Sequence, residues 1–284
     1  MDRRSAGEAK VASDPATTVF VMDPSSRWRE IMALPEDELP LDEAALLISA
    51  AADERVDVAA QLGRLDEAAG RAASDDVDAV CRLVFGTLGL RGDVRTYDDP
   101  RNSYLDQVLQ RRLGIPISLS VVLMEIGRRC GVLLEGVGMP GHFLVRDPSQ
   151  PDLLIDAFAA GRRLDRAACT ELLHRVAGAA VDLRPAYLAP VGPRAILTRM
   201  LANLDQSFQR RDDGDGRRWV TRLRAAIPGQ SPAELVALAD TLAALGCRDE
   251  AAALLEALSH SPEATTDVAR RLRTKARGLQ APFN

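Results

Sequence analysis

A change of hydrophobic period near residue 131 constrains the fold of this chain more than any other feature of its sequence. Residues 116–129 carry apolar side chains at helical spacing, and Gly131 suits the left-handed position at which helices often end. Apolar and polar residues then alternate in the segments 133–138, 142–146 and 153–158. The change predicts an α+β domain in which a buried central helix packs on three short antiparallel strands.

Helical periodicity continues on both sides of this unit, beginning at about Trp28. Helices are predicted before and after the strands at 42–54, 56–73, 76–90, 103–112 and 164–176. Later helices are predicted at 194–211, 216–227, 232–245 and 248–260. Pro228 and Pro262 close equivalent helices 34 positions apart, which is the period of tetratricopeptide repeats. The C-terminal pattern therefore predicts a tetratricopeptide-like tail.

These patterns divide the chain of 284 residues into three parts. Residues 1–27 are polar and lack periodicity, so a disordered leader is predicted there. Residues 28–185 are assigned to the α+β domain and residues 194–277 to the helical tail. Two degenerate repeats cannot bury their own apolar faces, so the tail is expected to dock on the first domain.

Charge and hydropathy exclude several classes of function. A formal net charge of −5 argues against nucleic-acid binding, because a phosphate backbone requires a basic surface. No apolar run approaches the roughly 18 residues that a membrane span needs. The start of the chain is charged and lacks the apolar segment of a secretory signal. We therefore expect a cytoplasmic protein that binds neither nucleic acid nor membranes.

The cysteines indicate reduced thiols. Cys81, Cys130, Cys169 and Cys247 lie far apart with no CxxC pair, a pattern typical of an intracellular protein without disulfides. The chain has only three histidines, and no set of His and Cys has the spacing of a tetrahedral metal site. No metal and no other cofactor is expected.

The candidates for chemistry lie between residues 102 and 158. Three segments contain them: NSYLDQVLQRRLGIPISLS, then PGHFLVR, then DAF. A helix that packs its first turn against a strand bearing His142 is one way to assemble a catalytic dyad, and Asp156 on the next strand supplies a third member. No cysteine stands at the start of this helix, so the usual nucleophile is missing.

Residues 41–158 resemble the SirB1 family, whose amino-terminal domain belongs to the transglutaminase-like superfamily. The resemblance rests on the segments just quoted and on the following Gly161-Arg162. The C-terminal helices, beginning ILTRMLANL, resemble the tetratricopeptide-like tail usual in that family. The resemblance implies a papain-like core. In active superfamily members a cysteine at the start of the central helix attacks an acyl group, a histidine on the next strand is its base, and an aspartate on the following strand orients the histidine.

The resemblance also implies a role for individual positions. His142 and Asp156 match the histidine and the aspartate. Gly131 matches the glycine after the cysteine-bearing helix, and a gapless count back from it puts Pro116 where the cysteine would stand. Ser118 is the nearest hydroxyl. Proline cannot be a nucleophile, and a serine needs full help from a general base.

Each candidate has a structural alternative. Ser118 is either a nucleophile or a helix N-terminal residue that bonds backbone amides. His142 and Asp156 are either a functional pair or a structural hydrogen bond that satisfies a buried acid. The residues predicted to line a cleft beside them are Asn102, Ser103, Pro116 and Gly141. For the pair Asn102-Ser103, the alternative is a cap on the following helix.

Three functions are compatible with these features. The favoured hypothesis is a non-catalytic transglutaminase-like binding or scaffold protein that keeps a cleft but lacks the thiol. The alternative is a hydrolase or acyltransferase that acts on an amide or ester through Ser118, His142 and Asp156. A third is a helical adaptor in which the first domain is a passenger. The expected partner is a protein or peptide, bound in the cleft or on the tail, and nothing in the sequence indicates an oligomeric state.

Overall fold

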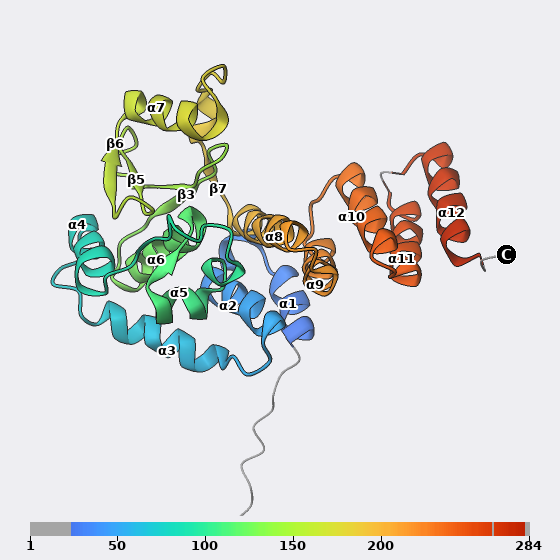
Figure 1. Cartoon of the computed structure of the whole chain (residues 1–284), viewed down its shortest axis with the longest axis horizontal. Coiled ribbons are helices and arrows are strands. Elements are labelled where there is room, and N and C mark those ends of the chain that lie inside the picture. The colour runs from blue at the N-terminus through green and yellow to red at the C-terminus, as the bar shows by residue number, and fades with distance from the viewer. Residues whose placement is uncertain (1–23, 263, 282–284) are drawn as a thin grey trace, which may run out of the picture.

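The computed structural model describes residues 24–262 and 264–281 (Figure 1). Most of the predicted leader, residues 1–23, lies outside the described residues. Its last four residues do not follow the prediction, because helix α1 (Pro24–Met32) begins at Pro24. The Trp28 side chain of α1 is buried, and its indole nitrogen donates a hydrogen bond of 3.1 Å to the Leu223 carbonyl oxygen in the C-terminal part of the chain.

The N-terminal helices form one side of the core. They are α1, α2 (Leu41–Ala52), α3 (Val58–Ala69) and α4 (Val77–Cys81), with the short helix η1 (Glu36–Glu38) and the π-helical segment η2 (Arg82–Thr87). Side-chain caps fix two of the starts, since Asp57 accepts from the Ala60 amide and Asp76 from the Ala79 amide. The three predicted helical segments in this region are confirmed.

The central helix α6 (Pro116–Arg129) is buried along most of its length, as predicted. Proline suits its first position because its missing N–H would have no partner there. Gly131, with φ of 77°, follows its end in the left-handed conformation. The helix contacts α2, α3 and α4, and it also contacts strands of the sheets described next.

The larger sheet formed by the described residues has the strand order β6-β5-β4-β3-β7, with every neighbouring pair antiparallel. Its strands are β3 (Glu135–Val137), β4 (Leu144–Arg146), β5 (Leu154–Asp156), β6 (Arg162–Leu164) and β7 (Pro190–Val191). The three predicted strands are confirmed, although each is shorter than predicted. The edge strands β6 and β7 were not predicted, because two or three residues carry too little alternation to be recognised.

The sheet separates two apolar clusters. Val145 and Ile155 face the main core with α6, whereas Leu144 and Leu154 face a second cluster with α7 (Arg166–Ala177). Figure 1 shows α6 and α7 on opposite sides of the sheet. Adjacent residues thus point to opposite faces, which is the period-two pattern that identified these strands.

A second, two-stranded sheet lies beside the start of α6. Its parallel strands are β1 (Arg91–Gly92) and β2 (Leu113–Gly114), and between them run the turn η3 (Pro100–Asn102) and helix α5 (Leu105–Arg111). The segment from residue 93 to 102, which connects the two strands, is therefore held next to α6. Helix α5 begins at Leu105, two residues later than predicted.

The C-terminal helices do not form one docked unit. They are α8 (Pro193–Arg210), α9 (Gly214–Ala225), α10 (Pro232–Ala244), α11 (Arg248–Ser259) and α12 (Thr266–Gln280), preceded by the turn η4 (Pro185–Leu188). Apolar residues of α8 and α9 belong to the main core. Helices α10 to α12 share a separate cluster and extend away from the domain (Figure 1). The expected docking on the first domain is thus right for α8 and α9. The predicted boundary at residue 194 does not separate two apolar cores, because the main core includes residues from both sides of it.

Within the described part of the chain, no helix combines the length and the apolar character that a membrane crossing requires.

Candidate functional site

His142 and Asp156 are in direct contact, as the sequence predicts. Nε2 of His142 lies 2.9 Å from Oδ1 of Asp156, and both side chains are buried. Asp156 is the last residue of β5, and His142 lies just before β4 rather than within it. Because β4 and β5 are neighbours in the sheet, residues 14 positions apart meet at its edge.

The Asp156 carboxylate is held in its charged form. Burial opposes ionisation, but the hydrogen bond and charge of His142, with the backbone amides of Ala159 and Phe158, lower the pKa of Asp156 below its usual value. An ionised carboxylate accepts a hydrogen bond from a protonated Nε2. Nδ1 is then the ring nitrogen without a partner among the described residues. The pair therefore presents an oriented imidazole.

A cavity of about 350 Å³ lies beside this imidazole. Its volume is within the range of small-molecule sites. Its lining residues come from the loop before α5, the start of α6, the turn before β4, and α8: Tyr97, Pro116, Ile117, Gly141, His142, Phe143, Arg199, Ala202, Asn203 and Gln206. This set of lining residues contains no cysteine, serine or threonine. Two of the four residues predicted to line the cleft, Pro116 and Gly141, do so.

Ser118 lies in the same turn of α6 as Pro116 but outside the cavity lining. Its hydroxyl donates to the Asn102 carbonyl oxygen at 2.6 Å and accepts from the Ile115 amide at 3.1 Å, and the side chain is fully buried. The predicted Ser118/His142/Asp156 arrangement is therefore wrong in its first member. The physical reason is that a serine at the third position of a helix satisfies backbone groups that the helix start leaves unpaired.

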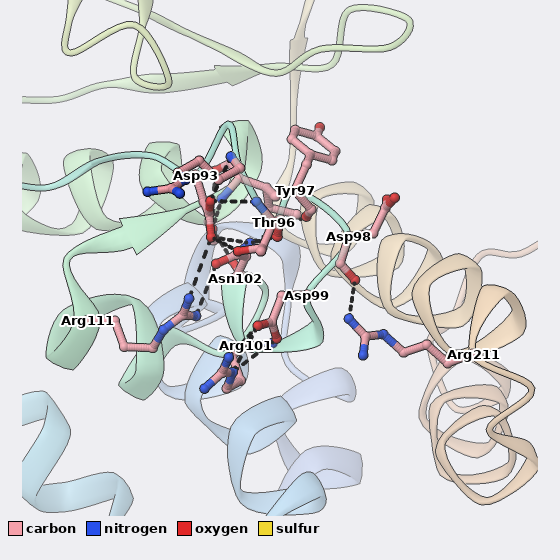
Figure 2. Close-up of polar contacts among 12 residues, drawn as sticks. Asp93, Thr96, Tyr97, Asp98, Asp99, Arg101, Asn102, Arg111 and Arg211 are labelled. Atoms are coloured by element: carbon pink, nitrogen blue, oxygen red, sulfur yellow. Dashed lines mark hydrogen bonds and ion pairs between the residues drawn. The ribbon is translucent and has the colours of Figure 1, made fainter.

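Asn102 is also buried away from the cavity. Its amide donates to the Thr96 carbonyl oxygen at 2.7 Å and to the Asp93 carboxylate at 3.2 Å, and its oxygen accepts from Arg111 at 3.1 Å. Figure 2 shows these side chains pointing toward one another. Asn102 neither lines the cleft nor caps α5, whose N-cap residue is Tyr104, so both predicted alternatives are wrong.

The same cluster positions Tyr97 at the cavity. Asp93 is buried, yet hydrogen bonds from Thr96, Asn102 and the Arg95 amide outweigh burial and lower the pKa of Asp93 to about 2. The charged carboxylate thus fixes the turn that carries Tyr97, whose ring points away from the cluster in Figure 2.

The ring of Tyr97 makes an edge contact with Phe158, which in turn makes an edge contact with His142. Ser103 was predicted to line the cleft beside His142. It lines instead a small adjacent hollow of about 40 Å³, which shares Tyr97 with the main cavity.

Arg199 is one of the cavity residues that the sequence prediction missed. Its Nη2 donates to the His142 carbonyl oxygen at 2.7 Å, and its guanidinium lies over the Phe143 ring, 5.6 Å from the centroid. It was overlooked because α8 was assigned to the tail. Arg199, Asn203 and Gln206 recur at helical spacing within an otherwise apolar face of α8, and this polar stripe is a signal that the sequence does contain.

The cysteines take no part in this site. All four are free thiols, and none lines the cavity. Burial raises the pKa of Cys81 and Cys130, and it raises the pKa of Cys169 to about 11. These three thiols therefore lack the lowered pKa of a catalytic cysteine.

Comparison with known proteins gives a family match and several relatives. The family described as the transglutaminase-like superfamily matches residues 48–202, more than half of the chain, and this span includes Arg199. A UPF0162 protein of Xylella fastidiosa is 38% identical over 222 residues, covering 72% of this chain and 78% of the relative. A UPF0162 protein of Pseudomonas aeruginosa is 38% identical over 193 residues, covering 65% of this chain and 70% of the relative.

A further relative matches a smaller share of the chain. The human F-box only protein 21 is 34% identical over 154 residues, which is 48% of this chain and 24% of that protein. No solved structure matches the chain significantly. The similarities therefore identify the family of this chain, but they do not identify a reaction.

Proposed function

This chain belongs to the transglutaminase-like superfamily and to the UPF0162 family within it, and we propose that it is a binding protein that does not form a covalent intermediate. Its cavity beside His142 holds a ligand, and the His142–Asp156 pair serves as a polar recognition group. The nucleophilic cysteine of the active superfamily members is replaced by Pro116.

One observation carries the proposal. Pro116 lines the cavity together with His142, at the helix start where the resemblance puts the nucleophile. A proline has neither thiol nor hydroxyl, and the lining contains no other thiol or aliphatic hydroxyl. Attack on an acyl group by a cysteine or a serine requires its thiol or hydroxyl within reach of the base.

The hydrolase alternative would use Ser118. Its hydroxyl proton is donated to the Asn102 carbonyl oxygen, and the side chain is 0% exposed. A serine nucleophile needs its base within hydrogen-bond distance and access to the substrate. The geometry thus favours the binding function.

A reactive thiol introduced at Pro116 tests the assignment of this position. In the Pro116→Cys variant, the start of α6 and His142 should both stabilise a thiolate. We expect iodoacetamide to label the new thiol faster than Cys81, Cys130 or Cys169, whose pKa values burial raises. Replacing His142 by alanine in this variant should slow the labelling at least about tenfold.

The matched control is Ser118→Cys. That side chain is fully buried among backbone groups, so its labelling should be slow and independent of His142. Faster labelling at position 118 than at 116 would show that the nucleophile position is assigned wrongly.

Activity probes test the absence of covalent chemistry in the natural chain. Fluorophosphonate and thiol-directed probes, followed by mass spectrometry of the labelled peptides, should give no adduct that depends on His142. A Ser118 adduct that disappears in His142→Ala would overturn the binding function in favour of the hydrolase.

The proposal also covers the finer family, the helical tail, the location and the partner of this protein. We assign the chain to the SirB1 family on the segments NSYLDQVLQRRLGIPISLS and PGHFLVR. We regard α8 to α11 as two degenerate tetratricopeptide-like pairs, on the 34-residue spacing of Pro228 and Pro262. The separated cysteines support a cytoplasmic protein, and we propose a protein or peptide as its partner.

A further inference from the structure

We propose that the cavity binds its ligand through a carboxylate held by Arg199, and that the ligand is the C-terminal end of a peptide. This inference rests on the proposed binding function and names the chemical class that the site selects.

Arg199 is a cation without an anionic partner. Its guanidinium contacts the His142 carbonyl oxygen and the Phe143 ring, and it makes no ion pair with any carboxylate of the described residues. Burial lowers the pKa of Arg199. A half-buried charge is costly unless it is paired, so an anion entering the cavity would relieve an existing energetic cost.

Several other partly buried arginines are paired with a carboxylate within the fold. Arg111 faces Asp93, Arg129 faces Asp42, and Arg194 faces Glu36. Arg199, by contrast, lines the cavity beside His142. A guanidinium also matches a carboxylate through two parallel hydrogen bonds, which gives the site geometric selectivity as well as charge.

The remaining walls suit a peptide end more than a highly charged anion. None of the described residues that line the cavity is acidic, and a single guanidinium balances a single negative charge. Asn203 and Gln206, one and two turns after Arg199 on α8, offer amide groups that pair with a peptide backbone. Pro116 and Phe143 provide apolar surface for a side chain.

The volume agrees with this occupant. A liquid water molecule takes about 30 Å³, so a cavity of about 350 Å³ has room for the last one or two residues of a peptide. A free organic acid of that size presents the same carboxylate. The two sources differ because only a peptide end has backbone groups that pair with the side-chain amides of Asn203 and Gln206. An Asn203→Ala variant therefore separates them.

The experiment is an NMR titration of the full chain with a panel of N-acetylated tetrapeptides of varied last residue. Each peptide is prepared with a free C-terminus and with an amidated C-terminus. The chain has three histidines, so the ring signals of His142 can be assigned by substitution and followed directly. We expect free-acid peptides to shift the His142 signals, and amidation to weaken binding at least tenfold.

Variants test whether Arg199 is the residue that holds the peptide carboxylate. Arg199→Gln should reduce the affinity for free-acid peptides at least tenfold, and Arg199→Lys should recover only part of it because lysine lacks the fork geometry. Arg271→Gln removes the same charge from an exposed position of α12 and should leave binding unchanged. The comparison of free and amidated peptides uses the natural chain, so it stands even if an Arg199 variant is unstable.

Several outcomes would overturn the inference. Equal binding of both peptide forms at His142 would reject the carboxylate while leaving the binding function in place. Unchanged affinity in Arg199→Gln would reject the assigned residue. Propionate or benzoate binding as tightly as the peptides, with no loss in an Asn203→Ala variant, would identify a free acid and reject the peptide end. No binding of any panel member would reject the inference, whereas the probe labelling described above decides the proposed function separately.

Discussion

Nη2 of Arg199 donates a hydrogen bond of 2.7 Å to the backbone carbonyl oxygen of His142. The bond joins α8 to the turn that carries the histidine, and so connects the two parts of the chain that line the cavity. Because Ile196 and Met200 of the same helix are buried in the main core, the position of Arg199 is fixed by packing. The first helix of the apparent tail is thus part of the site.

Replacing Asp156 by alanine should destabilise the fold. The variant leaves the buried His142 ring and the amides of Phe158 and Ala159 without their acceptor. Loss of a buried acceptor costs about 1–3 kcal/mol. We expect a lower midpoint of urea unfolding and shifted His142 ring signals.

The control for this change is Asp152→Ala, since Asp152 is exposed just before the same strand. It should leave both measurements unchanged. A stable Asp156→Ala variant with unshifted His142 signals would show that the pair contributes nothing to the site.

Acid should remove the contributions of Asp93 and Asp156 to stability. The folded-state pKa of each is below the value of roughly 3.9 in an unfolded chain. A lowered pKa stabilises the fold above the unfolded value, and this stabilisation is lost as the pH falls through the folded value. For Asp93 the window runs from about pH 4 to about 2.

Urea unfolding at a series of pH values measures this effect. In Asp93→Asn, stability at pH 7 should be lower and the slope below pH 4 should be smaller than in the natural chain. Parallel curves for the two proteins would contradict the assignment of the acid-sensitive contribution to Asp93.

The sequence could predict the elements that carry a long or regular pattern. Residues 116–129 satisfy the helical period over several turns, and the alternation around Val145 and Ile155 identifies a sheet with two covered faces. The contact between His142 and Asp156 followed from the resemblance, because adjacent strands of a known topology bring fixed positions together.

The sequence could not predict which polar groups turn toward the cavity. Ser118 and Pro116 are two positions apart, and only the hydrogen bonds of Ser118 to Asn102 and Ile115 decide that the serine is turned away. Arg199 was missed for another reason. Helical periodicity identifies α8 but contains no information on which domain its apolar face joins.

Asn102→Ala should be among the more destabilising polar substitutions, although Asn102 lies outside the cavity. Its buried side chain joins Asp93, Thr96 and Arg111 in a partly buried network. Leaving these groups unpaired costs about 1–3 kcal/mol. Asn203→Ala is the control, because Asn203 lines the cavity and should change the midpoint of thermal unfolding little. Equal midpoints for the two variants would contradict the structural role of Asn102.

Removal of α10 to α12 should leave the first domain folded. These helices share a cluster of their own, whereas Val220 and Leu223 of α9 belong to the main core. A chain that ends at residue 230 should keep a cooperative thermal transition and the His142 ring signals. A chain that ends at residue 192 loses α8 and α9 and should not fold cooperatively. Loss of cooperativity in the longer fragment would show that the outer helices stabilise the domain.

Two glycine substitutions should have opposite effects on stability. Gly141 has φ of 72°, and a Cβ atom there would lie 2.9 Å from a methyl carbon of Val176. Gly141→Ala should therefore destabilise the fold by at least about 1 kcal/mol and weaken ligand binding, since His142 is the next residue. Gly63 lies within α3 with no neighbour within 4 Å, so Gly63→Ala should stabilise by up to about 1 kcal/mol. Urea unfolding of both variants measures the difference, and a Gly141→Ala variant as stable as the natural chain would mean that the turn before β4 can relax without moving the histidine.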